Sequence, residues 1–102
     1  MMINIAANVR AIDTVKGELL SEIAKLYKTL ANYDDGPLYD DVLEELASIN
    51  AMSYILARRL GMNEKCVDDK MLMLLSAAVD NGHELEAEFS DMSSLAAYIR
   101  DR

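Results

Sequence analysis

Three glutamates and one serine are the residues whose types and spacing could do chemistry in this sequence. Glu18 and Glu22 are four residues apart, so in a helix they lie on the same side, one turn apart. Glu45 and Ser48 are three residues apart in a second amphipathic stretch. Carboxylate oxygens are the ligands that Mg²⁺ prefers, and Mg²⁺ completes its octahedron with water and phosphate oxygens. A magnesium site that holds a phosphate is therefore one prediction.

Helical geometry predicts which of these side chains meet. On the first predicted helix, Glu22 lies about 60° from the centre of the apolar face and Glu18 about 100°, on the same side. On the second, Glu45 lies about 60° off centre, whereas Glu44 is close to the opposite face and is expected to be solvated. Side chains offset in the same sense converge along one edge of an antiparallel contact. We therefore expect the three offset carboxylates to gather there, with the Ser48 hydroxyl in the fourth place.

The same glutamates also have an ordinary structural explanation. Three carboxylates at the edge of a helix pair repel one another, and the repulsion grows with burial. A divalent cation would relieve it, but so would neighbouring side chains, and the sequence offers Lys25, Lys28, Arg58 and Arg59. The residues alone leave both explanations open.

Four further residues are candidates for a site. Arg58 and Arg59 end the second predicted helix, where they either steer a phosphate or complement the helix dipole. His83 is the one histidine, with no second histidine or cysteine at a metal-ligand spacing, so we expect it to cap or pack a helix. Cys66 has no histidine nearby and is expected to be buried and inert.

The elements that must position these residues are helices. Apolar residues recur every three or four positions along 5–30, and again on one face of a second segment that follows residue 41, which predicts two long amphipathic helices. Between them, Gly36-Pro37 predicts the turn that makes the two helices antiparallel. Gly61 is expected to end the second helix. The two predicted helices thus form the scaffold of the carboxylate cluster.

The rest of the chain predicts shorter elements. Asn63 is expected to cap a third helix over 64–80, which Asn81-Gly82 closes. The segment "HELEAEF" predicts a turn or a short helix. Ser90 or Asp91 is then expected to cap a last helix, "MSSLAAYIRDR".

Composition and charge agree with one small all-α domain over 1–102. The 102 residues are 52% hydrophobic but only 6% aromatic, with one proline and no tryptophan. This is helix-forming composition with few strand-forming clusters. The formal net charge of -8 argues against a nucleic acid as a direct partner. A nucleotide stays possible if a divalent cation lies between the two sets of negative charge.

An antiparallel bundle of two long and two shorter helices makes a thin core, because a chain of this size buries only about 60–65% of its unfolded surface. The second predicted helix has another apolar side, with Leu43, Ala47, Tyr54 and Ala57. We expect that side to be a subunit interface, giving a homodimer or a higher homo-oligomer. The alternative is that the third helix covers it within one chain.

Localisation is predicted from what the sequence lacks. No apolar run approaches the roughly 18 residues that would span a membrane, and the opening residues do not lead to a signal-peptide cleavage site. The single cysteine cannot form an internal disulfide, which fits a reducing compartment. We therefore expect a soluble cytoplasmic protein with no membrane contact.

Three segments resemble the MazG-like family, a branch of the all-α nucleoside triphosphate pyrophosphohydrolases that includes MazG and the dimeric dUTPases. The order of long helix, turn and long helix and the segments "LARRLG" and "GHELE" carry the resemblance, which covers the chain from about residue 12 to its end. The three segments are "GELLSEIAKLYKTL", "EELASINAMSYILARRLGMN" and "DDKMLMLLSAAVDNGHELEAEFSDMSSL".

The resemblance implies a site with two departures. Fully active members carry E-x-x-E on the first long helix and E-x-x-D on the second, and these carboxylates hold Mg²⁺, which grips the triphosphate while water attacks and pyrophosphate leaves. Here the second motif is Glu45-Leu46-Ala47-Ser48, and the first becomes Glu18-x-x-x-Glu22. A neutral hydroxyl is a weaker ligand for a hard dication.

The resemblance thus implies a Mg²⁺-dependent nucleoside triphosphate pyrophosphohydrolase with an incomplete carboxylate site and weak or lost activity. The alternative is a non-catalytic helical module for oligomerisation or protein interaction.

Overall fold

The computed structural model describes residues 4–32 and 39–102. These residues contain no strand and form two compact units, Met1–Met62 and Asn63–Arg102. The predicted all-α architecture is confirmed, whereas the Gly36-Pro37 turn lies outside the described residues, and a single domain over 1–102 stays a prediction. The five helices are α1 (Ile5–Ala31), α2 (Tyr39–Arg59), α3 (Glu64–Asp80), α4 (Glu84–Phe89) and α5 (Asp91–Asp101).

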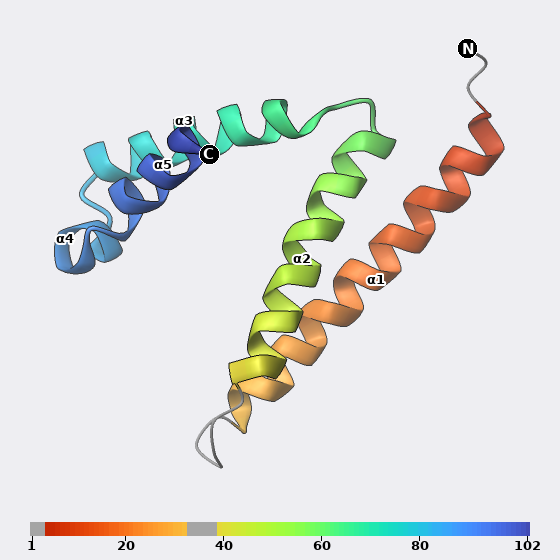
Figure 1. Ribbon diagram of the computed structural model, residues 1–102, viewed down its shortest axis with the longest axis horizontal. Coiled ribbons are helices and arrows are strands. Elements are labelled where there is room, and N and C mark those ends of the chain that lie inside the picture. Colours follow the sequence, from red (N-terminus) through yellow and green to blue (C-terminus); the bar gives the residue numbers. More distant parts are fainter. Residues whose placement is uncertain (1–3, 33–38) are drawn as a thin grey trace. The chain divides into compact units, whose positions relative to one another are not determined.

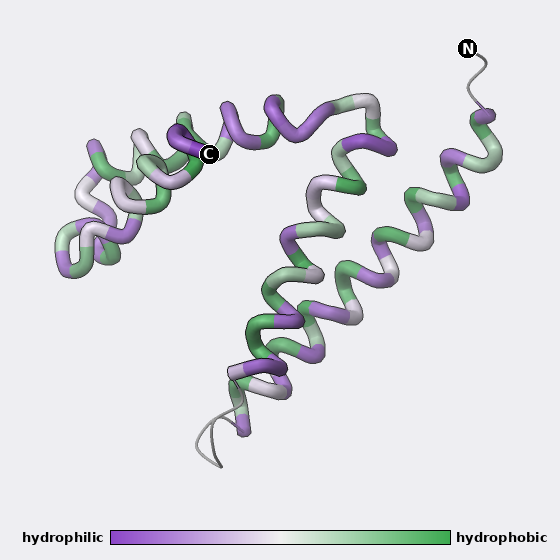
Figure 2. The backbone as a smooth tube through the Cα atoms, viewed as in Figure 1, coloured by the Kyte–Doolittle hydropathy of each residue, from purple (hydrophilic) through white to green (hydrophobic). Residues whose placement is uncertain are grey.

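The first unit is a pair of antiparallel helices, α1 and α2, which lie side by side (Figure 1). Hydrophobic and hydrophilic stretches alternate along both helices, as expected of amphipathic elements (Figure 2). The side chain of Asn4 begins α1 by accepting a 2.9 Å hydrogen bond from the N–H of Ala7. At the same end of the pair, the side-chain amide of Asn8 donates to the carbonyl of Arg59, the last residue of α2, at 2.8 Å. These contacts fix both the start of α1 and its register against α2.

Helix α2 ends as the sequence predicts. Gly61 adopts the left-handed conformation, with φ 89°, which costs glycine little because it has no Cβ. The N–H of Met62 then donates to the carbonyl of Ala57 at 2.8 Å, and that of Gly61 to Arg58 at 3.1 Å. This is the Schellman pattern of helix termination.

The second unit packs α3 against α5, with the short α4 between them in sequence (Figure 1). The side chain of Asn63 caps α3 by accepting from the N–H of Cys66 at 2.9 Å, and Gly82 ends the same helix at φ 69°. His83 caps α4, because its Nδ1 accepts from the N–H of Leu85 at 3.1 Å. The third helix has the predicted bounds, and the capping role expected of His83 is confirmed.

One expectation for the second unit is confirmed in part and another is wrong. Ser90 is the N-cap residue of α5, as predicted, but it has a left-handed φ of 59° and its side chain makes no capping hydrogen bond. Glu86 caps the helix instead, accepting from the N–H of Ser93 at 2.9 Å and from its hydroxyl at 2.8 Å. Cys66 is exposed rather than buried, because the partly buried side of α3 runs through other residues, among them Val67 and Met71.

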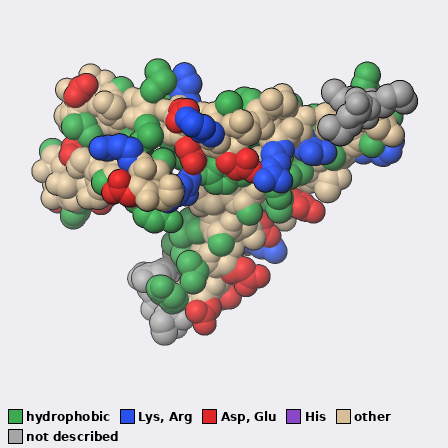
Figure 3. Space-filling view, turned by 45° about the horizontal axis from the view of Figure 1, so that its top comes forward, with side chains coloured by type: hydrophobic (Ala, Val, Ile, Leu, Met, Phe, Trp, Pro, Cys, Tyr) green, Lys and Arg blue, Asp and Glu red, His purple; other side chains and the backbone are tan. Residues whose placement is uncertain are grey.

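The core of the described chain is thin. Its buried apolar residues are Val15 and Ala57 in the first unit and Ala96 and Ile99 in the second. Among the described residues, no large side chain is less than 2% exposed. Figure 3 shows hydrophobic side chains open to solvent across one face of the molecule. None of the described helices is both long and apolar enough to cross a bilayer.

Candidate functional site

Glu45 is a buried acid in the contact between α1 and α2, with 9% of its surface exposed. The hydroxyl of Thr29 donates a 2.6 Å hydrogen bond to its Oε1. Its Oε2 is also buried and has no hydrogen-bond partner among the described residues. A buried carboxylate oxygen without a partner is costly, because it has lost water and gained nothing in exchange. The helix pair therefore contains an acidic group whose bonding is incomplete.

The local sequence explains why Glu45 is buried. It occupies the same side of α2 as the partly buried Ile49, Met52 and Leu56, which follow it at helical spacing. On the facing helix, the hydroxyl oxygen of Thr29 also lies 3.0 Å from the carbonyl oxygen of Lys25, so the hydroxyl stays close to the backbone. A charged residue thus interrupts the apolar stripe that joins the two helices.

A pocket of about 170 Å³ lies beside Glu45. Glu22 and Lys25 line it from α1, and Asp41, Glu44 and Glu45 line it from α2. Lys25 Nζ lies 3.2 Å from Glu22 Oε1. Four carboxylates and one ammonium make the lining acidic, and their oxygen atoms are the donor type that hard divalent cations take.

The structure brings together only part of the predicted cluster. Glu22 and Glu45 line the same pocket, from opposite helices, as their helical positions predict. Glu18 is exposed, Ser48 is partly buried, and neither is among the residues that line the pocket. A metal-binding role for Glu18, Glu22 and Glu45 stays a prediction.

Two pocket residues escaped the sequence analysis. Glu44, expected to be only solvated, lines the pocket, and so does Asp41. Asp41 lies three residues before Glu44 and four before Glu45, a spacing that places all three acids along one side of α2. That spacing was the signal that could have found them.

The two arginines lie elsewhere on α2. Arg58 and Arg59 are exposed in its last turn. Thirteen residues separate Arg58 from Glu45, which corresponds to about 20 Å along a helix axis. Their phosphate-binding role stays a prediction, and their position at the helix end also suits the dipole.

The ordinary explanation of the acidic cluster receives some support. Lys25 pairs with Glu22, as that explanation requires. Within residues 4–32 and 39–102, no three His, Cys, Asp or Glu side chains are arranged so that they could hold a metal ion. Cation binding in the pocket therefore requires some of its carboxylates to turn toward a common point.

The chain was compared with protein-family models, with curated proteins and with solved structures. The model described as "MazG-like family" matches residues 5–92. No curated protein and no solved structure matches. The family match includes both long helices, all of α3 and α4, and the whole lining of the acidic pocket. Because it covers most of the sequence, this protein belongs to the MazG-like family.

Proposed function

We propose that this protein binds a nucleoside triphosphate together with Mg²⁺ at the acidic pocket between α1 and α2, and that its pyrophosphohydrolase activity is weak or lost. The observation that carries the proposal is the buried Oε2 of Glu45, which has no partner among the described residues. A glutamate on the solvent-exposed surface of a helix would have water as a partner for both of its oxygens. A cation in the pocket would give that oxygen a partner and offset the cost of its burial.

The pocket residues suit a hard cation in type and number. Mg²⁺ is commonly held by one or two carboxylates plus water and substrate phosphate, and Glu22, Asp41, Glu44 and Glu45 offer four. The ion pair between Lys25 and Glu22 is a weak competitor, because the lysine side chain is 61% exposed and exposed pairs contribute about 0–1 kcal/mol. We infer that Lys25, once its ion pair with Glu22 is broken, would contact a phosphate oxygen.

The expected reaction is hydrolysis of a nucleoside triphosphate to a monophosphate and pyrophosphate. A bound cation would stabilise the charge that develops on the phosphates. The chain's own contribution is that the carboxylates would hold the cation and the ammonium of Lys25 would contact the triphosphate. Ser48 stands where active family members carry an aspartate, so one anionic ligand is missing from the family pattern. We therefore expect the protein to bind the nucleotide and the metal even though it hydrolyses the nucleotide slowly or not at all.

Calorimetric titration of Mg²⁺ and Mn²⁺, with and without a non-hydrolysable dNTP analogue, tests the proposal. We expect metal binding that the analogue strengthens and that Glu45→Gln removes. Glu88→Gln, which changes an acid of the second unit, is the matched control and should bind as the unchanged protein does. Absence of binding at millimolar metal in the presence of the analogue would overturn the proposal. Release of pyrophosphate from a panel of nucleotides then measures the remaining activity.

A second candidate function, a non-catalytic oligomerisation module, is favoured by the exposed apolar side chains of the first unit. Leu20 and Tyr27 on α1 are 69% and 73% exposed, and they lie seven residues apart, on one side of the helix. On α2, Leu43 is 53% exposed, whereas Ala57, expected on the same face, is buried within the chain. A second copy of the helix pair would bury these side chains in a four-helix arrangement.

Sedimentation equilibrium tests the module directly. We expect a dimer that Leu43→Asp converts to a monomer, because a carboxylate cannot be buried there without a partner. Ile55→Asp is the matched control, since Ile55 is also exposed but lies on another side of α2. A monomer at all concentrations would remove this candidate and leave the nucleotide proposal untouched.

A further inference from the structure

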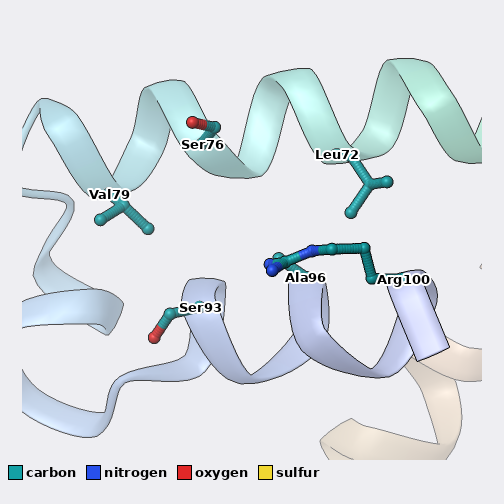
Figure 4. Close-up of a pocket in the computed structure, with 6 residues that line it drawn as sticks. All are labelled: Leu72, Ser76, Val79, Ser93, Ala96 and Arg100. Atoms are coloured by element: carbon teal, nitrogen blue, oxygen red, sulfur yellow. The ribbon is translucent and has the colours of Figure 1, made fainter.

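The second unit contains a groove of its own, between α3 and α5 (Figure 4). Its volume is about 430 Å³, within the range of roughly 300–1,000 Å³ that small-molecule sites occupy. Three of its lining side chains are apolar, two are hydroxyls and one is a guanidinium. These residues are Leu72, Ser76, Val79, Ser93, Ala96 and Arg100.

Arg100 is the charged group of this groove. Its side chain extends from α5 into the space between the two helices (Figure 4). Among the described residues, its guanidinium has no ion pair and no hydrogen bond, whereas Arg102 binds Asp68 at 2.6 Å and Lys65 binds Asp69 at 2.8 Å. Residues 63–102 hold nine Asp and Glu but only four Lys and Arg. An arginine left unpaired in so acidic a unit is available to an external anion.

The two serines of the groove differ in what they can offer. The hydroxyl of Ser93 already donates to Glu86 Oε2 at 2.8 Å, so it is not a free donor. Glu86 also accepts from the N–H of Ser93, which ties α4 to the start of α5 at one end of the groove. Ser76 makes no hydrogen bond through its hydroxyl to any described residue. The free donors at the groove are therefore the guanidinium of Arg100 and the hydroxyl of Ser76.

We propose that this groove binds a small amphipathic monocarboxylate, an anionic head on an unbranched apolar chain. The guanidinium of Arg100 binds the carboxylate, because an arginine presents two parallel N–H donors that match its two oxygens. Leu72, Val79 and Ala96 contact the apolar chain. One cation suits a single negative charge, and the surrounding acids disfavour ligands with two or more, such as nucleotides. This site is separate from the acidic pocket and does not depend on it.

The position of Arg100 also decides against a docked helix. An apolar helix laid along α3 and α5 would cover the guanidinium and leave it without water or a counter-ion, which is costly. A carboxylate removes that cost by pairing with it. The groove is thus better suited to a small anion than to a protein segment.

Titration of the full chain with octanoate, followed by ¹H–¹⁵N correlation spectra, tests the proposal. We expect saturable shifts of amides in α3 and α5. Affinity should rise roughly fourfold per methylene from butanoate through hexanoate to octanoate, an upper estimate for full burial. The uncharged 1-octanol should bind at least about tenfold more weakly, because it lacks the ion pair.

Two variants and one control complete the test. Arg100→Gln should weaken octanoate binding by about tenfold or more, whereas Lys70→Gln, a cation of α3 outside the groove, should not. If Arg100→Gln loses its helical spectrum, Ser76→Leu decides, since it fills the groove from an exposed position and should abolish the shifts. Equal binding of octanoate and octanol, or binding unchanged in both groove variants, would overturn the proposal. So would shifts in α3 and α5 that depend on protein concentration alone, which would mean that a second copy occupies the groove.

Discussion

The hydroxyl of Thr29 on α1 donates a 2.6 Å hydrogen bond to one oxygen of Glu45 on α2, while the other oxygen of that carboxylate has no partner among the described residues. The bond joins the two long helices at the acidic pocket. It also holds the carboxylate in a buried position beside Glu22, Asp41 and Glu44. The same side chain is therefore central both to the stability of the helix pair and to the proposed cation site.

Removing the Thr29 hydroxyl is expected to destabilise the helix pair. Thr29→Val keeps the shape of the side chain but leaves both oxygens of Glu45 unpaired, which should cost about 1–3 kcal/mol of unfolding free energy. Thr29→Ser retains the hydroxyl and is the matched control. Urea unfolding followed by circular dichroism at constant pH measures both. Equal stability of the two variants would mean that the hydrogen bond contributes little.

Glu44 and Glu18 should differ in their effect on metal affinity. Glu44 lines the pocket and Glu18 does not. Losing one anionic ligand should weaken Mn²⁺ binding by about tenfold in Glu44→Gln, with a much smaller change in Glu18→Gln. Calorimetry with the dNTP analogue present gives both affinities. The opposite order would support the cluster predicted from helical spacing and remove Glu44 from the site.

Gly17 is expected to weaken α1 without any structural need for a glycine. A Cβ built there meets no atom within 4 Å, and Gly17 is not among the glycines with positive φ. Gly17→Ala should therefore stabilise the protein by about 0.5–1 kcal/mol. Gly61→Ala is the contrasting control, since its φ of 89° is strained for any side chain, and it should destabilise. Thermal unfolding that ranks the two the other way would contradict the helix geometry.

The Glu86 cap predicts a loss of stability in acid. The backbone N–H and then the hydroxyl of Ser93 hold the pKa of Glu86 below its usual 4.5. A lowered pKa contributes stability that is fully present above the unfolded value and is lost as pH falls through the folded value. We therefore expect unfolding below about pH 4.5 to be less pH-dependent in Glu86→Gln than in the unchanged protein. Glu88→Gln, on the same helix, should keep the original pH dependence; if it behaves like Glu86→Gln, the cap is not the cause.

The sequence predicts the helices well because their ends are set by local chemistry. Asn63, Gly61 and Gly82 each act within a few residues, so their roles could be assigned without knowing the fold. The missing side-chain cap of Ser90 could not be predicted, because Glu86 makes the capping contact instead. Glu86 and Ser93 are seven residues apart in the sequence, and only the packing of α4 on α5 brings them together.

The site could be predicted only in part, because the centre of an apolar stripe is not always the buried line of a helix. The helical pattern predicts Glu45 about 60° away from the centre of the apolar face of α2, but Glu45 is buried, whereas the neighbouring Leu46 is 43% exposed. The helix is therefore rotated toward its acids, which brings Glu44 and Asp41 to the pocket. Exposed apolar residues shift the apparent centre of the apolar face. The sequence alone cannot distinguish them from residues of the core.

Paramagnetic broadening by Mn²⁺ in ¹H–¹⁵N spectra, with the dNTP analogue present, tests the central claim most directly. If the acidic pocket holds the metal, the amides of residues 22–25 and 41–45 should broaden first, at sub-stoichiometric Mn²⁺, while those of residues 5–8 and 57–60, at the far end of the same helix pair, stay sharp. Glu45→Gln should remove the effect. Broadening spread over exposed acids of both units, or none in the pocket, would contradict the account and leave the glutamates as structural residues of a helix pair.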